Sequence, residues 1–315
     1  MDDHHEPIPQ LSPMLATAGT LPRGARWVYE IKWDGIRALV AVRADGSVAI
    51  TTRLGNDATA SFPELAGLGP LLAAAGVTAL IDGEIVAFGA DGRPSFARLQ
   101  QRLGVGGADA SRRATEVPVV FAAFDLLHLN GMSTRTLPWT DRRSLLERIW
   151  PGDGPAWRLP AVHDDGEALL AAVRQADLEG VVAKRRDAPY RPGRRATTWV
   201  KVKHLNVDDV VIGGWVPGER GRSGTIGALL VGVPVSDEPG APLRPLGRVG
   251  TGFSQEELAR LRVRFEELAT DVCPFAGRAD PAGRWVRPVL RCRVEYREIT
   301  PDGVMRHPSY KGLVG

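Results

Sequence analysis

Lysine is rare in this chain, and one lysine lies in a segment whose residue types suit covalent chemistry. Of the 40 lysines and arginines, only five are lysines, namely Lys32, Lys184, Lys201, Lys203 and Lys311. Arginine stays protonated at any working pH, whereas a lysine amine can lose its proton when it is desolvated or crowded by other cations, and then it is a nucleophile. Lys32 lies between Glu30 and Asp34, and Arg37 follows within the same short segment. Lys32 is therefore the candidate nucleophile.

Five further short motifs follow this segment along the chain. They are Arg53-Leu54-Gly55, Asp82-Gly83-Glu84, Phe124-Asp125-Leu126-Leu127, Glu179-Gly180-Val181-Val182-Ala183-Lys184 and Lys201-Val202-Lys203. Each motif alone has an ordinary structural explanation: a turn, a core aromatic ring, or a solvated face of a strand. Together they supply cations and carboxylates, which in-line phosphoryl transfer needs for positioning and charge stabilisation.

The ordered set resembles the covalent nucleotidyltransferases, that is, DNA ligases, RNA ligases and mRNA capping enzymes. Lys32 to Arg37 matches their pattern Lys-x-Asp-Gly-x-Arg, and residues 190–195, 213–215, 227–232 and 248–253 resemble the ligase portion of bacterial DNA ligase D and the related stand-alone ligase C enzymes. The resemblance implies an ATP-dependent DNA ligase that seals nicks or breaks in double-stranded DNA through a lysyl-AMP and a 5′-adenylated DNA intermediate. It also implies a role in DNA repair by end joining.

The resemblance also implies roles for individual residues. Catalytic roles fall to Lys32, Asp34, Arg37, Lys201 and Lys203. Nucleotide binding falls to Glu30, Ile31, Arg37, Arg53, Glu84, Phe124, Lys201 and Lys203. Phe124 would stack on the adenine ring, and Glu30 would read its amino group.

Two further roles concern metal and DNA. Glu84 and Glu179 are the expected ligands of Mg²⁺ or Mn²⁺, because hard cations prefer carboxylate oxygens. The expected DNA-binding residues are Arg53, Arg191, Arg194 and Arg195. Contacts of the last three with the DNA backbone should be sensitive to salt, and residues 184–203 carry eight lysines and arginines against one acid.

The C-terminal segment departs from the family pattern. The family usually places basic residues near a terminal Asp-Lys pair that orients pyrophosphate, and here Arg306 and Lys311 are the candidates for that role. Either these two suffice or the chain loads itself slowly with AMP. Three alternatives to a DNA ligase stay open: an RNA ligase, a GTP-using capping enzyme, and a non-catalytic protein that binds nicks.

The elements that must position these residues indicate an α+β fold in two domains. Residues 1–204 should form a nucleotidyltransferase (ATP-grasp-like ligase) domain, and residues 205–315 a small OB-fold β-barrel around one helix that starts at the cap Ser254. In the first domain we expect an irregular lead-in at 7–24, strands at 27–33, 36–43, 47–53, 78–88, 118–127, 181–185 and 198–203, and helices at 62–75, 95–103, 140–149 and 166–176. In the second we expect strands at 210–216, 225–233, 243–250 and 285–299.

Composition fits an ordinary globular protein, with 43% hydrophobic and 24% charged residues. No run of about 18 apolar residues occurs, and the first residues lack the features of a signal peptide. Cys273 and Cys292 show no metal-type or redox-type spacing, so we expect reduced thiols. The expected protein is a cytoplasmic monomer that binds broken DNA, with other end-joining repair proteins as further partners and no membrane.

Overall fold

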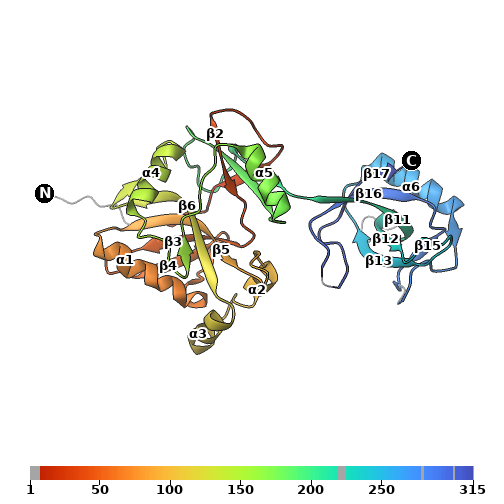
Figure 1. Cartoon of the computed structure of the whole chain (residues 1–315), viewed down its shortest axis with the longest axis horizontal. Coiled ribbons are helices and arrows are strands. Elements are labelled where there is room, and N and C mark those ends of the chain that lie inside the picture. Colours follow the sequence, from red (N-terminus) through yellow and green to blue (C-terminus); the bar gives the residue numbers. More distant parts are fainter. Residues whose placement is uncertain (1–7, 219–224, 278–279, 301, 315) are drawn as a thin grey trace. The chain divides into compact units, whose positions relative to one another are not determined.

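The chain forms two compact units, Met1–His204 and Leu205–Gly315 (Figure 1). The computed structural model describes residues 8–218, 225–277, 280–300 and 302–314. None of the helices in these ranges is both long and apolar enough to cross a membrane.

The first unit contains two β-sheets. One sheet has the strand order β1 (Leu15–Ala18), β10 (Arg195–Lys203), β9 (Gly180–Arg185) and β2 (Trp27–Ile31). The other runs in the order β4 (Val48–Thr52), β3 (Ile36–Val42), β5 (Ala79–Ala87), β6 (Val119–Leu129) and β7 (Met132–Ser133), with β8 (Trp157–Arg158) beside β6. Among the described strands of this unit, only β1 with β10 and β6 with β8 pair in parallel, so most neighbours are antiparallel.

Short helices cover these sheets. They are the 3₁₀ turns η1 (Thr59–Ser61) and η2 (Pro63–Gly67) and the helices α1 (Leu68–Ala74), α2 (Phe96–Gln100), α3 (Gly107–Glu116), α4 (Trp139–Ile149) and α5 (Gly166–Gln175). Helix α5 lies along β2 and β9 (Figure 1), where Leu169 and Val173 pack with Tyr29 and Val181. A larger core of the same unit includes Phe121 of β6.

Three expectations for the first unit were wrong. The lead-in at 7–24 contains β1, which pairs with β10 from Leu15 opposite Arg195, because its hydrogen-bond partners lie far along the chain and leave no local signal. The predicted helix at 62–75 is split into η2 and α1, since Pro63 opens the segment as a 3₁₀ turn. Helix α3 was not predicted, because its residues are mostly polar and Ala110 is its only buried residue.

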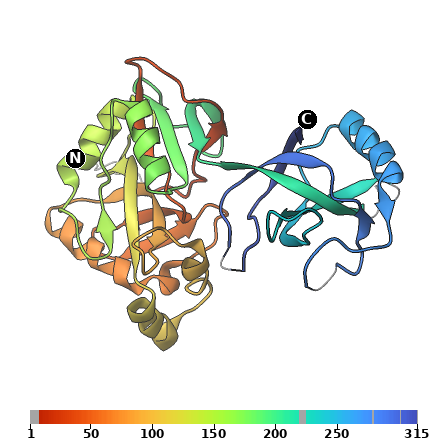
Figure 2. The ribbon, with the colours of Figure 1, turned by 45° about the vertical axis from the view of Figure 1, so that its right-hand side comes forward.

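In its described residues, the second unit is an antiparallel sheet with one helix. Its strands are β11 (Asn206–Pro217), β12 (Ile226–Pro234), β13 (Leu243–Val249), β14 (Ala269–Thr270), β15 (Arg284–Val286), β16 (Arg291–Tyr296) and β17 (Ser309–Val314), and its helix is α6 (Gln255–Glu267). Helix α6 is drawn in blue in Figure 2. Its Leu261 and Phe265 belong to the core of this unit. The Ser254 side chain accepts a hydrogen bond from the Glu257 amide, which confirms the predicted cap.

Two details of the second unit differ from the prediction. The strand expected at 285–299 is divided into β15 and β16, because Pro288 lies between them and cannot donate to a ladder. The final strand β17, which pairs with β16, was not predicted. Short strands around one helix still agree with the predicted OB-fold class.

Candidate active site

A cavity of about 170 Å³ in the first unit is lined by residues of both sheets. Lys32 follows β2 directly, and its amide donates to the carbonyl of Gly180 at 2.8 Å, which holds it beside β9. The cavity brings the predicted nucleophile Lys32 together with seven of the predicted nucleotide-binding residues, but not with Lys203. The seven are Glu30, Ile31, Arg37, Arg53, Glu84, Phe124 and Lys201.

The Lys32 amine is held by a carboxylate. Its Nζ lies 2.5 Å from Oε2 of Glu179, and Oε1 of the same carboxylate lies 3.5 Å from Nζ of Lys203. Burial lowers the pKa of Lys201, and the positive charges of Lys32 and Lys203 lower it further. The site therefore concentrates three lysines around one glutamate, and Lys32 must leave Glu179 before its lone pair can attack.

A groove of about 680 Å³ adjoins the cavity and shares Lys32, Arg37, Arg53 and Glu84 with it. Asp34 and Glu179 line only the groove. Burial raises the pKa of Glu84 to about 7; Arg37 and Lys32 oppose this rise, and the neighbouring carboxylate of Glu179 adds to it.

These two carboxylates fit a hard divalent cation. Within the ranges that the structure describes, no group of three or more His, Cys, Asp or Glu side chains could hold a metal. Mg²⁺ commonly takes only one or two protein carboxylates together with waters and substrate phosphates. Glu84 and Glu179 could supply these carboxylates. Burial is the main cause of the raised pKa of Glu84, and a bound cation would offset both this burial and the smaller repulsion from Glu179.

Glu30 in the cavity wall carries an unused hydrogen-bond acceptor. Glu30 is 5% exposed, and its Oε2 accepts from the Lys184 amine at 2.7 Å. Its Oε1 is buried and finds no hydrogen-bond partner among the described residues. The Lys184 amine also lies 4.4 Å from the ring centroids of Phe124 and Trp199. A ligand group that donates a hydrogen bond would satisfy Glu30.

Arg37 is fixed by an ion pair with two hydrogen bonds. Its Nε and Nη2 donate to the carboxylate oxygens of Asp82 at 2.5 and 2.7 Å, and its Cζ lies 4.4 Å from the Phe124 centroid. Burial alone would lower the pKa of Arg37, but the charge and hydrogen bonds of Asp82 raise it above its ordinary value. The Tyr190 hydroxyl donates to Asp82 at 2.5 Å. Arg37 therefore keeps both its charge and its direction.

All four predicted DNA-binding arginines are exposed, namely Arg53, Arg191, Arg194 and Arg195. Arg53 and Arg195 also line the cavity, where Arg195 donates to the carbonyl of Ala16 at 2.7 Å.

The pyrophosphate candidates lie in the second unit. Arg306 pairs with Glu298 at 2.7 Å and Lys311 with Glu295 at 2.6 Å. Each pair lies wholly within that unit.

Sequence reasoning missed three residues of the cavity region. Lys184 and Trp199 line the cavity, and Asp82 holds Arg37. The sequence does contain a signal for Lys184, because it is a charged residue at the end of the otherwise apolar run 180–184. Asp82 lies in the motif Asp82-Gly83-Glu84, but its pairing with Arg37 of another strand leaves no local signal, and the same is true of the contacts of Trp199.

Comparison with known proteins agrees with this geometry. The sequence model of the ATP dependent DNA ligase domain matches residues 12–203, and that of the ATP dependent DNA ligase C terminal region matches residues 222–314. The chain is 42% identical over 311 residues to the Multifunctional non-homologous end joining DNA repair protein LigD of Mycobacterium tuberculosis, covering 96% of this chain and 38% of that protein.

Solved structures give the same result. The ligase domain of M. tuberculosis LigD and a mycobacterial DNA ligase D in complex with ATP and MES are each 40% identical to this chain, with a TM-score of 0.57. Each comparison covers 96% of this chain and 95% of the other. The predicted fold class is confirmed, and the chain belongs to the family of ATP-dependent DNA ligases.

Proposed function

We propose that the chain seals nicks or breaks in double-stranded DNA, with ATP as the source of energy and Lys32 as the nucleophile. One observation carries this proposal: a single cavity contains the Lys32 amine, an aromatic wall and the unpaired Oε1 of Glu30. These are the parts needed to hold a nucleotide with its α-phosphate beside an amine.

The unpaired atom of Glu30 favours adenine over guanine. An ionised carboxylate accepts hydrogen bonds only, and Glu30 is paired with the Lys184 amine. The exocyclic amino group of adenine would donate to Oε1, whereas guanine carries an acceptor carbonyl at that position. This argues against a GTP-using capping enzyme. Phe124 in the cavity wall would support the face of the base.

The chemistry follows from the lysine cluster. Once Lys32 leaves Glu179 and loses a proton, its nitrogen attacks the α-phosphorus of ATP, and the bond to the bridging oxygen breaks to release pyrophosphate. The 5′-phosphate of a nick then attacks the same phosphorus, and the amine leaves with a proton. The 3′-hydroxyl finally attacks the 5′-phosphorus and expels AMP. Lys201, Lys203 and Arg195 would stabilise the negative charge of the phosphates.

Mg²⁺ or Mn²⁺ held by Glu84 and Glu179 would supply further positive charge to the phosphates. Asp34 lines the adjoining groove and Arg37 both spaces, where they would help to orient the reacting groups. In this proposal Ile31 contacts the nucleotide, and Arg306 and Lys311 orient the departing pyrophosphate.

The exposed arginines would hold the DNA backbone. Arg53 lies where the cavity and the groove meet, so it would contact the phosphate at the nick. Arg191 and Arg194 would bind flanking phosphates, and this contribution should weaken as salt increases. We infer that the protein acts as a monomer in the bacterial cytosol, in end-joining repair with other repair proteins.

Covalent labelling tests the first step. The protein is incubated with α-labelled ATP or GTP and a divalent metal, and then separated on a denaturing gel. Label from ATP that is absent in Lys32→Arg supports the proposal, because arginine keeps the charge but cannot present a neutral amine. Label from GTP would indicate a capping enzyme. No label from either nucleotide would indicate a protein that only binds nicks.

A further inference from the structure

We propose that Arg142 is a positioning residue for the nucleotide cavity, acting through Asp125 and Ala188 on the two segments that carry Phe124 and Tyr190. The inference rests on the proposed use of this cavity for ATP. Neither the proposed chemistry nor the comparisons assign a role to Arg142.

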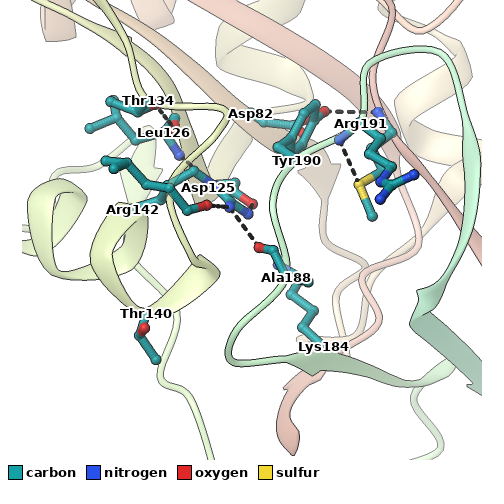
Figure 3. A network of polar contacts seen from close by, with 12 residues as sticks. Asp82, Asp125, Leu126, Thr134, Thr140, Arg142, Lys184, Ala188, Tyr190 and Arg191 are labelled. Atoms are coloured by element: carbon teal, nitrogen blue, oxygen red, sulfur yellow. Dashed lines mark hydrogen bonds and ion pairs between the residues drawn. The ribbon is translucent and has the colours of Figure 1, made fainter.

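The guanidinium of Arg142 is fully buried and makes four hydrogen bonds. It extends from α4 toward Asp125 and Ala188 (Figure 3). Its Nε and Nη2 donate to the Asp125 carboxylate at 2.7 and 2.8 Å, and its Nη1 donates to the carbonyls of Leu137 at 2.7 Å and Ala188 at 2.9 Å. Both Arg142 and Asp125 are 0% exposed. This many bonds leave the guanidinium only one orientation.

The first segment held in this way is the part of β6 that carries Phe124. Asp125 is the next residue along the strand, and its Oδ1 also accepts from the amide of Leu126 at 2.9 Å. Strand β6 is irregular at this point, because Ala123 pairs with Gly83 and Asp125 with Asp82, which leaves Phe124 without a partner on β5. The ion pair of Asp125 therefore fixes the irregular backbone from which the Phe124 ring reaches the wall of the cavity.

The second segment leads to Arg37. Ala188 lies two residues before Tyr190, and the Arg142 Cζ lies 5.7 Å from the Tyr190 ring centroid. The Tyr190 hydroxyl accepts from the Met14 amide at 2.8 Å and donates to Asp82, the partner of Arg37. One buried cation thus connects the aromatic wall of the cavity with the support of its arginine.

A buried ion pair is weak evidence for stability, since an apolar pair of similar volume is often as good. The hydrogen bonds of Arg142 require a more specific geometry, because its planar guanidinium must donate to a carboxylate and two carbonyls at the same time. Loss of this fork should shift the cavity wall, and misplacements of about 1 Å can reduce activity roughly a hundredfold.

The chain offers a matched control in Arg102. This residue is also 0% exposed, and it donates to both carboxylate oxygens of Glu64 and to the carbonyls of Val117 and Ser61. Neither Arg102 nor Glu64 lines the nucleotide cavity. Its removal should disturb folding in a similar way without moving Phe124 or Tyr190.

The test compares Arg142→Lys and the apolar double variant Arg142→Met, Asp125→Leu with the control Arg102→Met, Glu64→Leu. The apolar double variants are included because a single loss would leave a buried charge unpaired and could prevent folding. Calorimetric titration measures ATP binding without metal. Covalent labelling measures both the ATP concentration for half-maximal rate and the rate at saturating ATP, and thermal unfolding gives Tm.

Both Arg142 variants should need about tenfold more ATP for binding and for half-maximal labelling, with a smaller loss of rate at saturation. The Kd of the control for ATP should stay within about twofold of the wild-type value, even if its Tm falls as much as that of the Arg142 variants. Unchanged ATP binding in folded Arg142 variants would overturn the inference, as would an equal loss in the control. Wild-type protein that binds ATP without taking label would refute only the covalent step, whereas wild-type protein that binds no ATP would end both proposals.

Discussion

The ion pair between Glu30 and Lys184 should couple the stability of the first unit to the base pocket. The two side chains are 6% and 2% exposed, and Nζ lies 2.7 Å from Oε2. Removing one member of a buried pair leaves an uncompensated charge, at a cost of about 3–5 kcal/mol. We expect Lys184→Met to lower the free energy of unfolding by about this amount, since the contacts of the amine with Phe124 and Trp199 are also lost.

A double-mutant cycle makes this prediction quantitative. Glu30→Met should be as harmful as Lys184→Met, because it leaves the ammonium unpaired. The double variant should lie within about 1 kcal/mol of the wild type or above it, since apolar pairs often replace buried ion pairs without loss. Urea unfolding of the four proteins at neutral pH measures the cycle. If each single variant loses less than about 1 kcal/mol and the losses add in the double variant, the pair is not the buried charge pair described above.

Three further predictions concern single features of the site. Phe124→Ala should raise the ATP concentration needed for half-maximal labelling about ten- to hundredfold, because base–aromatic stacking is worth roughly 1–3 kcal/mol. Phe124→Tyr should be tolerated. If both variants behave as wild type, the ring is an ordinary core residue. Folding raises the pKa of Glu84 to about 7, against 4.5 for the free side chain, so metal-free protein should lose stability as the pH rises from 4.5 to 7. Glu84→Gln should therefore be about 1–3 kcal/mol more stable than wild type at pH 8 and equal to it at pH 4. Parallel curves of Tm against pH for the two proteins would contradict this. Arg306→Ala with Lys311→Ala should slow self-labelling much more than sealing of a nick that already carries 5′-AMP, with little change in Tm because the two ion pairs are partly exposed; equal losses in both assays would refute a role confined to pyrophosphate.

The sequence was informative wherever the signal is local. The central strands β3, β5 and β6 contain apolar runs, and Ser254 is a recognisable cap for α6. The predicted bounds of these elements therefore agree with the structure to within a few residues. Strand β1 was missed, because it exists only through pairing with β10.

The same division holds for the candidate site. The motifs predicted which residues would surround Lys32, and the cavity brings most of them together. They did not predict the ion pair between Lys32 and Glu179, which joins positions 147 residues apart. They also did not reveal Arg142, because an arginine on a helix usually faces solvent, and only the packing of α4 on β6 buries it against Asp125.

Transfer of AMP in a single turnover tests the central claim most directly. Protein carrying labelled AMP is freed of ATP and mixed with a DNA duplex that contains one nick. The label should leave the protein, appear at the 5′-phosphate of the nick and then be released as AMP while the strand is sealed. Label that stays on the protein while the strand remains open, or a Lys32→Arg variant that seals the same nick with ATP, would contradict the account.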